Sequence, residues 1–104
     1  MRLRRYELLL PLRYNDGTDI EDDKLQSTYQ ELVDRFGAAT IQPQALQGRW
    51  TSEGLLYEDS LIRLFVDAPD TEETARFFRA YKETLKGRFR QIEIWMTAHT
   101  VDVI

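Results

Sequence analysis

The segment "GRWTSEGLLYEDSLIRLFVD", residues 48–67, places two strand-like runs on either side of a short polar turn. The turn is "TSEG", residues 51–54, and Gly54 stands where a tight connection between strands needs a left-handed residue. This pattern predicts a β-hairpin in which Trp50 and Leu55 flank the turn. The hairpin decides the fold, because it makes two consecutive strands antiparallel neighbours in one sheet.

The sequence predicts one strand of this hairpin more clearly than the other. Residues 55–67 alternate between two faces, with one set consisting of Ile62, Leu64 and Val66 and the other of Leu61, Arg63, Phe65 and Asp67. Residues 39–50 form a weaker strand that contains Pro43. Because proline cannot donate a hydrogen bond to a neighbouring strand, we expect this weaker strand at an edge of the sheet.

A helix is expected before the hairpin. Thr18 and Glu21 have the spacing of a capping box, which satisfies free amide groups at a helix start. Apolar residues follow within an arc of about 100° when they are placed on a helix. They are Leu25, Tyr29, Leu32, Val33 and Phe36. Gly37 then stands where a left-handed residue ends a helix.

A second helix is expected after the hairpin. Asp70 would cap its start, with Glu73 three residues further on. The apolar face of this helix consists of Phe77, Phe78, Tyr81 and Leu85. Gly87 is the residue expected to end it.

Alternating apolar residues predict one strand near each end of the chain. The first has Tyr6, Leu8, Leu10 and Leu12 on one side and Glu7, Leu9 and Pro11 on the other. The last has Ile92, Ile94 and Met96 opposite Glu93, Trp95 and Thr97, while residues 98–104 either bend or pair with something else. The order strand–helix–strand–strand–helix–strand predicts a ferredoxin-like α+β fold, with residues 1–104 as a single domain. We expect a four-stranded antiparallel sheet with two helices on one face and the first and third strands at its centre.

The composition is that of a folded globular domain of 104 residues, 42% hydrophobic and 31% charged. The formal net charge of -4 implies no general affinity for nucleic acid or anionic lipid. The absence of cysteine excludes disulfides, thiolate catalysis and iron–sulfur clusters, and it fits a reducing compartment. The apolar run at residues 8–10 is too short for a signal peptide, and no segment approaches the ~18 apolar residues of a membrane span. We therefore expect a cytoplasmic protein that does not contact a membrane.

Few residues indicate catalysis. Glu58 and Asp59 resemble a carboxylate pair, but adjacent side chains of a strand point to opposite faces and cannot share a substrate proton. His99 is the only histidine, and nothing beside it forms a nucleophile pair, so we expect it on the surface. The acidic residues between positions 16 and 23 lack the ligand spacing of a calcium loop. We expect no metal, no cofactor and no assigned catalytic activity.

The sheet face that the helices leave open carries more apolar groups than a solvated monomer usually shows. Besides Glu7 and Glu93, it would present six candidate binding or interface residues: Leu9, Leu61, Arg63, Phe65, Trp95 and, nearby, Trp50. Aromatic residues and arginine dominate protein interfaces. We therefore expect identical chains to associate sheet to sheet, as a homodimer or a higher homo-oligomer, or to enclose a small-ligand pocket between them.

Residues 36–89 resemble small uncharacterised bacterial proteins, many of which are described only as domains of unknown function. The shared motifs are Phe36-Gly37, Gly48-Arg49-Trp50, Gly54, Glu58, the aliphatic run at 61–66 and "KGRF" at 86–89. The resemblance covers about half of the chain. It implies a ferredoxin-like fold in a bacterial protein and no established activity.

A second resemblance is to dimeric α+β barrels that include small monooxygenases, some of which degrade haem with an asparagine, a tryptophan and a histidine. Asn15, Trp50 or Trp95, and His99 occur here in that order, although in different local contexts. This resemblance implies a small oxidoreductase, with Asn15 and His99 as its catalytic candidates. The first expectation remains a self-associating binding or assembly domain.

RNA binding through the aromatic face of the sheet is a third alternative. The glycine–aromatic signature of RNA-binding sheet domains is absent, and two glutamates on that face would repel phosphate. The sequence therefore places nucleic-acid binding below self-association and below the oxidoreductase.

Overall fold

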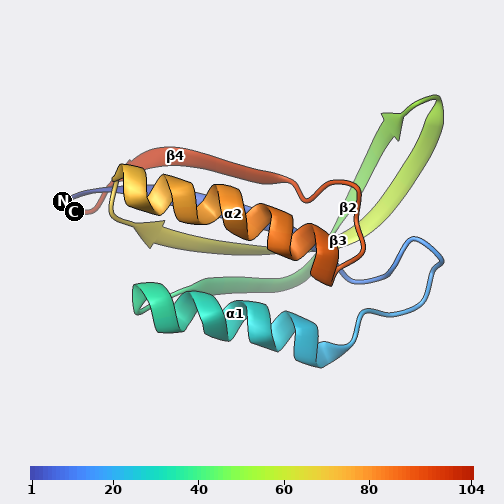
Figure 1. Cartoon of the computed structure of the whole chain (residues 1–104), viewed down its shortest axis with the longest axis horizontal. Coiled ribbons are helices and arrows are strands. Elements are labelled where there is room, and N and C mark those ends of the chain that lie inside the picture. Colours follow the sequence, from blue (N-terminus) through green and yellow to red (C-terminus); the bar gives the residue numbers. More distant parts are fainter.

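A computed structural model of residues 1–104 contains a four-stranded antiparallel sheet with two helices on one face (Figure 1). The strands are β1 (Arg2–Pro11), β2 (Thr40–Ser52), β3 (Leu55–Ala68) and β4 (Met96–Asp102), and the helices are α1 (Asp22–Phe36) and α2 (Glu72–Arg88). The strand order β2-β3-β1-β4 places β1 and β3 at the centre and β2 at an edge. The predicted ferredoxin-like α+β fold is confirmed.

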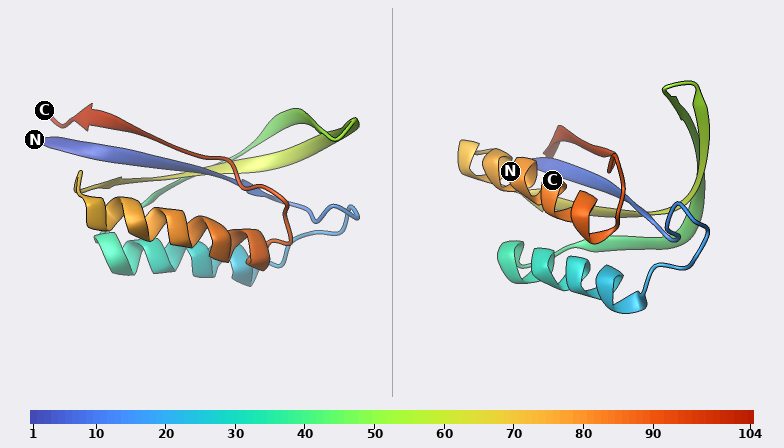
Figure 2. Two further views of the ribbon diagram at one scale, coloured as in Figure 1. Left: turned by 45° about the horizontal axis from the view of Figure 1, so that its top comes forward. Right: turned by 45° about the vertical axis from the view of Figure 1, so that its right-hand side comes forward.

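The core lies between the central strands and the helices, which cover the same side of the sheet in both views of Figure 2. Leu8 of β1 pairs with Leu64 of β3, and both side chains are completely buried. Side chains two residues away in either direction along each strand point the same way. The alternate residues Tyr6, Leu10, Ile62 and Val66 therefore join the same core.

Aromatic rings connect this sheet face to the helices. Tyr6 of β1 stacks on Phe78 of α2 with ring centroids 4.0 Å apart, and Phe36 at the end of α1 stacks on the same Phe78 at 5.4 Å. Phe78 is 1% exposed. Phe78 therefore links β1, α1 and α2 in one contact cluster.

Neither helix has the length and apolar composition needed to cross a membrane.

The two predicted helix starts are wrong in detail. Glu21 precedes α1 but makes no capping bond; its side chain accepts a hydrogen bond from the buried Tyr14 hydroxyl, while Thr18 bonds Asp16 instead. Thr71 rather than Asp70 caps α2, because its hydroxyl accepts the amide of Thr74 at 3.2 Å. At the start of α1, the two residues of the expected capping box bond other groups, so no side chain caps the helix. At the start of α2, a neighbouring hydroxyl takes the place of the expected carboxylate.

The two predicted helix ends have different outcomes. Gly37 does end α1, in the left-handed conformation with φ 86°. Gly87 does not end α2, which continues through Arg88. Phe89 is completely buried beyond it, and the chain turns at Arg90, where φ is 52°. Burial of this aromatic ring outweighs the weak helix propensity of a single glycine.

The last strand is shorter at its start and longer at its end than the alternation predicted. It begins at Met96, and pairing with β1 extends from Leu8↔Met96 to Arg2↔Asp102. The segment beyond Ala98 therefore completes the sheet. Val103 also exchanges backbone hydrogen bonds with Met1, so the two termini lie together (Figure 1).

The β2–β3 hairpin extends beyond the ends of the helices and curls away from the rest of the sheet (Figures 1 and 2). Its tip is a two-residue turn, with Glu53 and Gly54 both at positive φ, as a tight hairpin of this twist requires. A register shift between Gln42 and Leu46 surrounds Pro43 and bends the edge strand. The predicted hairpin and edge position are confirmed.

Replacing Phe78 by alanine tests the contact cluster. We expect Phe78→Ala to lower the free energy of unfolding by about 3–5 kcal/mol, because it removes a buried ring and leaves a cavity. Urea denaturation followed by circular dichroism measures the change. Arg76→Ala, an exposed position on the same helix, is the control and should stay within about 0.5 kcal/mol of the parent. Equal losses in the two variants would contradict the role of Phe78.

Candidate binding groove on the open sheet face

The open face of the sheet has two chemically different halves. Strand register places Leu9, Leu61, Arg63 and Phe65 on this face, as the alternation predicted. Arg63 and Phe65 lie in a charged half, toward the chain termini. Leu9 and Leu61 lie in the other half, beside the hairpin, where Trp50 and Trp95 join them.

In the charged half, Phe65 lies between two guanidinium groups. Arg5 is 4.4 Å and Arg63 is 4.5 Å from the centroid of its ring. Each arginine also bonds a carboxylate of the same face: Arg5 donates to both oxygens of Asp67 at 2.7 and 2.9 Å, and Arg63 donates to Glu7. Cations thus cover the aromatic ring, and carboxylates neutralise the cations.

These contacts perturb the carboxylates. The hydrogen bond from Arg5 lowers the pKa of Asp67, and the hydrogen bond from Arg63 lowers the pKa of Glu7, in each case against a smaller opposing effect of burial. His99, opposite Arg5 on β4, acts in the same direction on the pKa of both carboxylates. The charged half is therefore internally compensated and offers no free cation to a phosphate.

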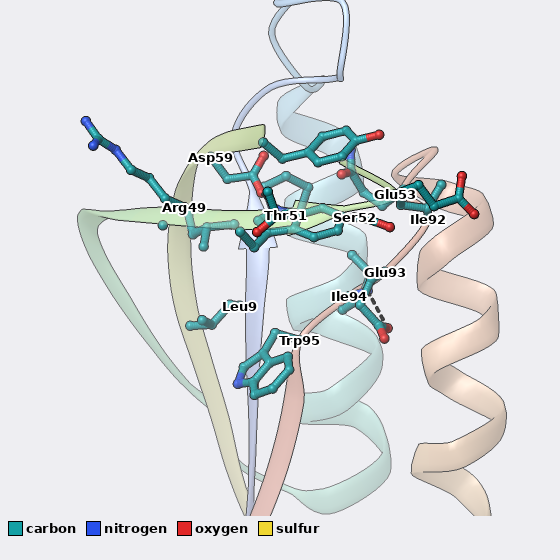
Figure 3. A pocket seen from close by; sticks show the side chains of 16 residues that line it. Leu9, Arg49, Thr51, Ser52, Glu53, Asp59, Ile92, Glu93, Ile94 and Trp95 are labelled. Carbon is teal, nitrogen blue, oxygen red and sulfur yellow. Dashed lines mark hydrogen bonds between the residues drawn. The ribbon is translucent and has the colours of Figure 1, made fainter. Parts of the chain in front are cut away.

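The other half forms a groove of about 990 Å³ between the hairpin and the segment that connects α2 to β4 (Figure 3). Its residues come from β1, from the hairpin and from residues 91–95. Leu9, Pro11 and Leu61 supply apolar side chains from the central strands. Gly48 lies on β2 where a Cβ atom would be 3.2 Å from Leu61 Cδ1, so a glycine there lets Leu61 pack closely.

One wall of the groove is an aromatic pair on the hairpin. Trp50 pairs with Tyr57 across the two strands, and their rings stack with centroids 4.4 Å apart. The indole Nε1 of Trp50 donates to Asp59 Oδ2 at 2.7 Å, which fixes the orientation of the ring. The expected partner of Trp50, Leu55, pairs with Ser52 instead, because the turn is two residues long.

The opposite wall is the α2–β4 connector. Buried Ile94 anchors it in the core, and the amide of Leu9 donates to the carbonyl of Trp95 at 3.0 Å. The side chain of Trp95 then lies beside Leu9 at the groove (Figure 3) and is 63% exposed. Since these residues are not a strand, the predicted face of Ile92 is wrong, and its side chain is 55% exposed instead of buried. Glu93 lines the groove as the predicted face requires, and its carboxylate pairs with Lys82 of α2 at 2.9 Å.

The remaining candidate residues lie apart from this groove. Asn15 is in the loop between β1 and α1, and His99 is an exposed residue of β4; neither lines the groove that contains both tryptophans. Glu58 and Asp59 point to opposite faces of the hairpin, with Glu58 bonded to Arg49 at 3.2 Å. No group of three or more histidine, cysteine or acidic side chains is placed to hold a metal ion.

Tyr57 and Asp59 are two groove residues that the sequence pattern did not indicate as binding residues. A two-residue turn at positions 53 and 54 pairs Trp50 with Tyr57 by counting alone, so the spacing around "TSEG" contained this signal. The bond between Trp50 and Asp59 is diagonal across the two strands and depends on the twist of the hairpin.

Comparisons with known proteins establish the fold and no family. No protein-family model matches the sequence, and no curated protein sequence matches it. The structure is similar to that of a phage SAM lyase in complex with S-methyl-5'-thioadenosine, with a TM-score of 0.70 and 12% identity over 97% of this chain and 90% of the lyase. It is also similar to the divalent cation tolerance protein CutA1 of Thermus thermophilus, with a TM-score of 0.65 and 17% identity over 99% and 86%.

A third similar structure is CutA of Synechococcus elongatus, with a TM-score of 0.62 and 12% identity over 96% of this chain and 77% of that one. Such low identities support a shared ferredoxin-like fold and carry no activity from one protein to another. The resemblance to small bacterial domains is accordingly supported only at the level of the fold.

The Arg5–Asp67 pair makes a pH-dependent contribution to stability. We expect Asp67→Asn to lower the free energy of unfolding at neutral pH by about 1 kcal/mol, a value reduced for the partial exposure of both side chains. Because the folded state lowers the pKa of Asp67, this stabilisation is fully present above the ordinary aspartate pKa of about 3.9. It disappears as the pH falls through the lower pKa of the folded state.

Urea denaturation of both proteins between neutral and acidic pH measures this difference. Asp102→Asn is the control, because its pair with Arg2 is long, at 3.7 Å, and highly exposed. A stability difference for Asp67→Asn that stays constant across the acid range would contradict the ion-pair mechanism.

The indole bond to Asp59 can be tested separately from the aromatic stack. Trp50→Phe retains a ring beside Tyr57 but removes the donor, and we expect it to cost about 1 kcal/mol of unfolding free energy. Trp95→Phe removes an indole that donates no hydrogen bond within the chain and should cost less than about 0.5 kcal/mol. Chemical denaturation distinguishes the two, and a larger loss for Trp95→Phe would contradict this assignment.

Proposed function

We propose that this chain is a binding protein that self-associates through the groove half of its open sheet face, so that a second copy closes the groove. The observation that carries the proposal is a set of exposed apolar side chains in the groove and at the hairpin end. Trp95 and Ile92, which line the groove, are 63% and 55% exposed, and Leu55, next to the hairpin turn, is 61% exposed. Large exposed apolar side chains in one region are typical of an interface.

The arrangement of the elements explains why the chain cannot bury these residues itself. The hairpin extends beyond both helices, so no helix of the same chain covers its end (Figure 2). β2 is an edge strand, and its outer backbone groups from Leu46 to Ser52 are free to pair with another strand. A second copy offers both an apolar face and a strand edge of matching chemistry.

The charged half of the face is compatible with this mode of association. Arg5 and Arg63 already bond Asp67 and Glu7. The same surface of a second copy therefore brings no unpaired charge against the charged half. Compensated pairs add little affinity by themselves, and the apolar groove half supplies the driving force. The product is a homodimer or a higher homo-oligomer.

A ligand role for the enclosed space agrees with the comparisons. The similar phage SAM lyase was solved with S-methyl-5'-thioadenosine, so a protein of this fold can hold a small organic molecule. The oxidoreductase alternative gains no support from the site, because Asn15 and His99 lie outside the groove. RNA binding gains none either, because the two arginines beside Phe65 are paired with carboxylates.

Size-exclusion chromatography with light scattering tests the proposal. We expect a dimer or larger species for the parent protein, and Trp95→Glu should raise its dissociation constant at least tenfold, because it places a charge in a desolvated apolar contact. A monomer at all accessible concentrations would refute self-association.

Leu56→Glu is a matched control for this experiment. Leu56 is 63% exposed, as Trp95 is, but it does not line the groove. It precedes the groove residue Tyr57 in β3, and adjacent side chains of a strand point to opposite faces. We expect Leu56→Glu to leave the oligomer intact. Dissociation by Leu56→Glu without an effect of Trp95→Glu would place the interface on the opposite face and contradict the proposal.

A further inference from the structure

We propose that the groove binds a small aromatic organic cation, with Asp59 as its counter-ion. The proposal depends on three features that meet in this groove: aromatic faces, an apolar floor, and a carboxylate that no cation of the chain neutralises. The site uses residues of one chain only. It therefore goes beyond self-association and does not depend on it.

The aromatic faces are those of the Trp50–Tyr57 stack and of Trp95. The stacked pair presents flat π-surface on the hairpin side, and Trp95 presents a largely exposed ring on the connector side. Aromatic faces carry partial negative charge and attract cations, with tryptophan the strongest of them. They also stack with a planar ligand ring. A ligand with both a ring and a positive charge uses both properties.

Asp59 differs from two other acidic groups beside the groove, which are both paired with cations. Glu58 is paired with Arg49, and Glu93 is paired with Lys82. Asp59 is half-buried and has one hydrogen-bond donor, the indole of Trp50, on its Oδ2 atom. Its second oxygen remains available to a donor or a cation. A partly buried carboxylate next to apolar surface favours a positively charged partner.

The charges nearby reinforce this preference. Glu53, at the hairpin tip, is a second acidic residue of the groove and forms no ion pair. The one basic residue in the lining, Arg49, is bonded to Glu58, and its side chain extends away from the other labelled residues in Figure 3. A ligand in the groove therefore meets net negative charge, which favours a cation over an anion of the same shape.

The size and floor of the groove suit a small molecule. A volume of about 990 Å³ is at the upper end of ordinary small-ligand sites. Leu9 and Leu61 form an apolar floor between the two aromatic walls. A flat ring can thus lose most of its contact with water while its charged group remains at Asp59.

A series of three probes with one ring and different charges tests this inference: phenethylamine as the cation, 2-phenylethanol as the neutral analogue and 3-phenylpropanoate as the anion. The chain contains only two tryptophans and both line the groove, so their fluorescence reports directly on binding. We expect phenethylamine to bind about tenfold more tightly than the alcohol, and the acid to bind most weakly. Equal affinities for the amine and the alcohol in the parent protein would overturn the proposal.

Two variants identify the counter-ion. Asp59→Asn should remove the preference for the amine while the alcohol still binds, whereas Asp102→Asn, at the far end of the sheet and outside the groove lining, should retain it. If Asp59→Asn retains the tenfold preference, the assignment of Asp59 is wrong. Because the parent's discrimination between amine and alcohol needs no variant, a folding defect in Asp59→Asn cannot obscure the outcome.

Light scattering on the same samples separates this inference from self-association. A monomer that still prefers the amine would support the cation site and refute the proposed oligomer. An oligomer that binds all three probes equally would support assembly and refute the cation site. Isothermal titration calorimetry with phenethylamine then gives the number of sites per chain, for which we expect one.

Discussion

The antiparallel pairing of β1 with β3 is the constraint on which the rest of the structure depends. Its register, from Arg4↔Ala68 to Pro11↔Leu61, brings the alternating apolar residues of both strands into phase. One face then fits against α1 and α2, and the other is left open. A slip of one residue would turn every side chain of a strand to the wrong face, so burial of the shared core holds the register. The composition of the open face follows from the same pairing.

The second determinant is a difference in length between the layers. The hairpin extends beyond the helices, so its end has solvent on both faces (Figures 1 and 2). The ferredoxin-like core ends there, and the twist of two free strands curls Trp50 and Tyr57 over the sheet. The connector after α2 supplies the other wall because Ile94 is drawn into the core and leaves Trp95 outside. The groove therefore forms between the end of the hairpin, which no helix covers, and the connector after α2.

Charge is distributed unequally over the open face, and this gives the two halves different roles. Around Phe65, arginines and carboxylates satisfy one another and stabilise the folded chain. At the groove, Asp59 has an indole partner and no cation, and it lines the same groove as the exposed ring of Trp95. Carboxylates that already pair with arginines stabilise the folded chain, whereas an unpaired carboxylate beside apolar surface favours the binding of a ligand or partner. The proposed association and the proposed ligand both belong to the second kind of surface.

Local patterns in the sequence determined the elements and their order: the two amphipathic helices, the "TSEG" turn, the edge strand marked by Pro43 and the two faces of the central strands. They could do so because helix and strand periods and turn residues act over a few neighbouring positions. Only the tertiary structure decided that α2 continues past Gly87 to the buried Phe89 and that residues 91–95 leave the sheet. It alone also placed Tyr57 and Asp59 beside Trp50 in one groove. These outcomes depend on burial and twist among residues far apart in the chain, which no local pattern records.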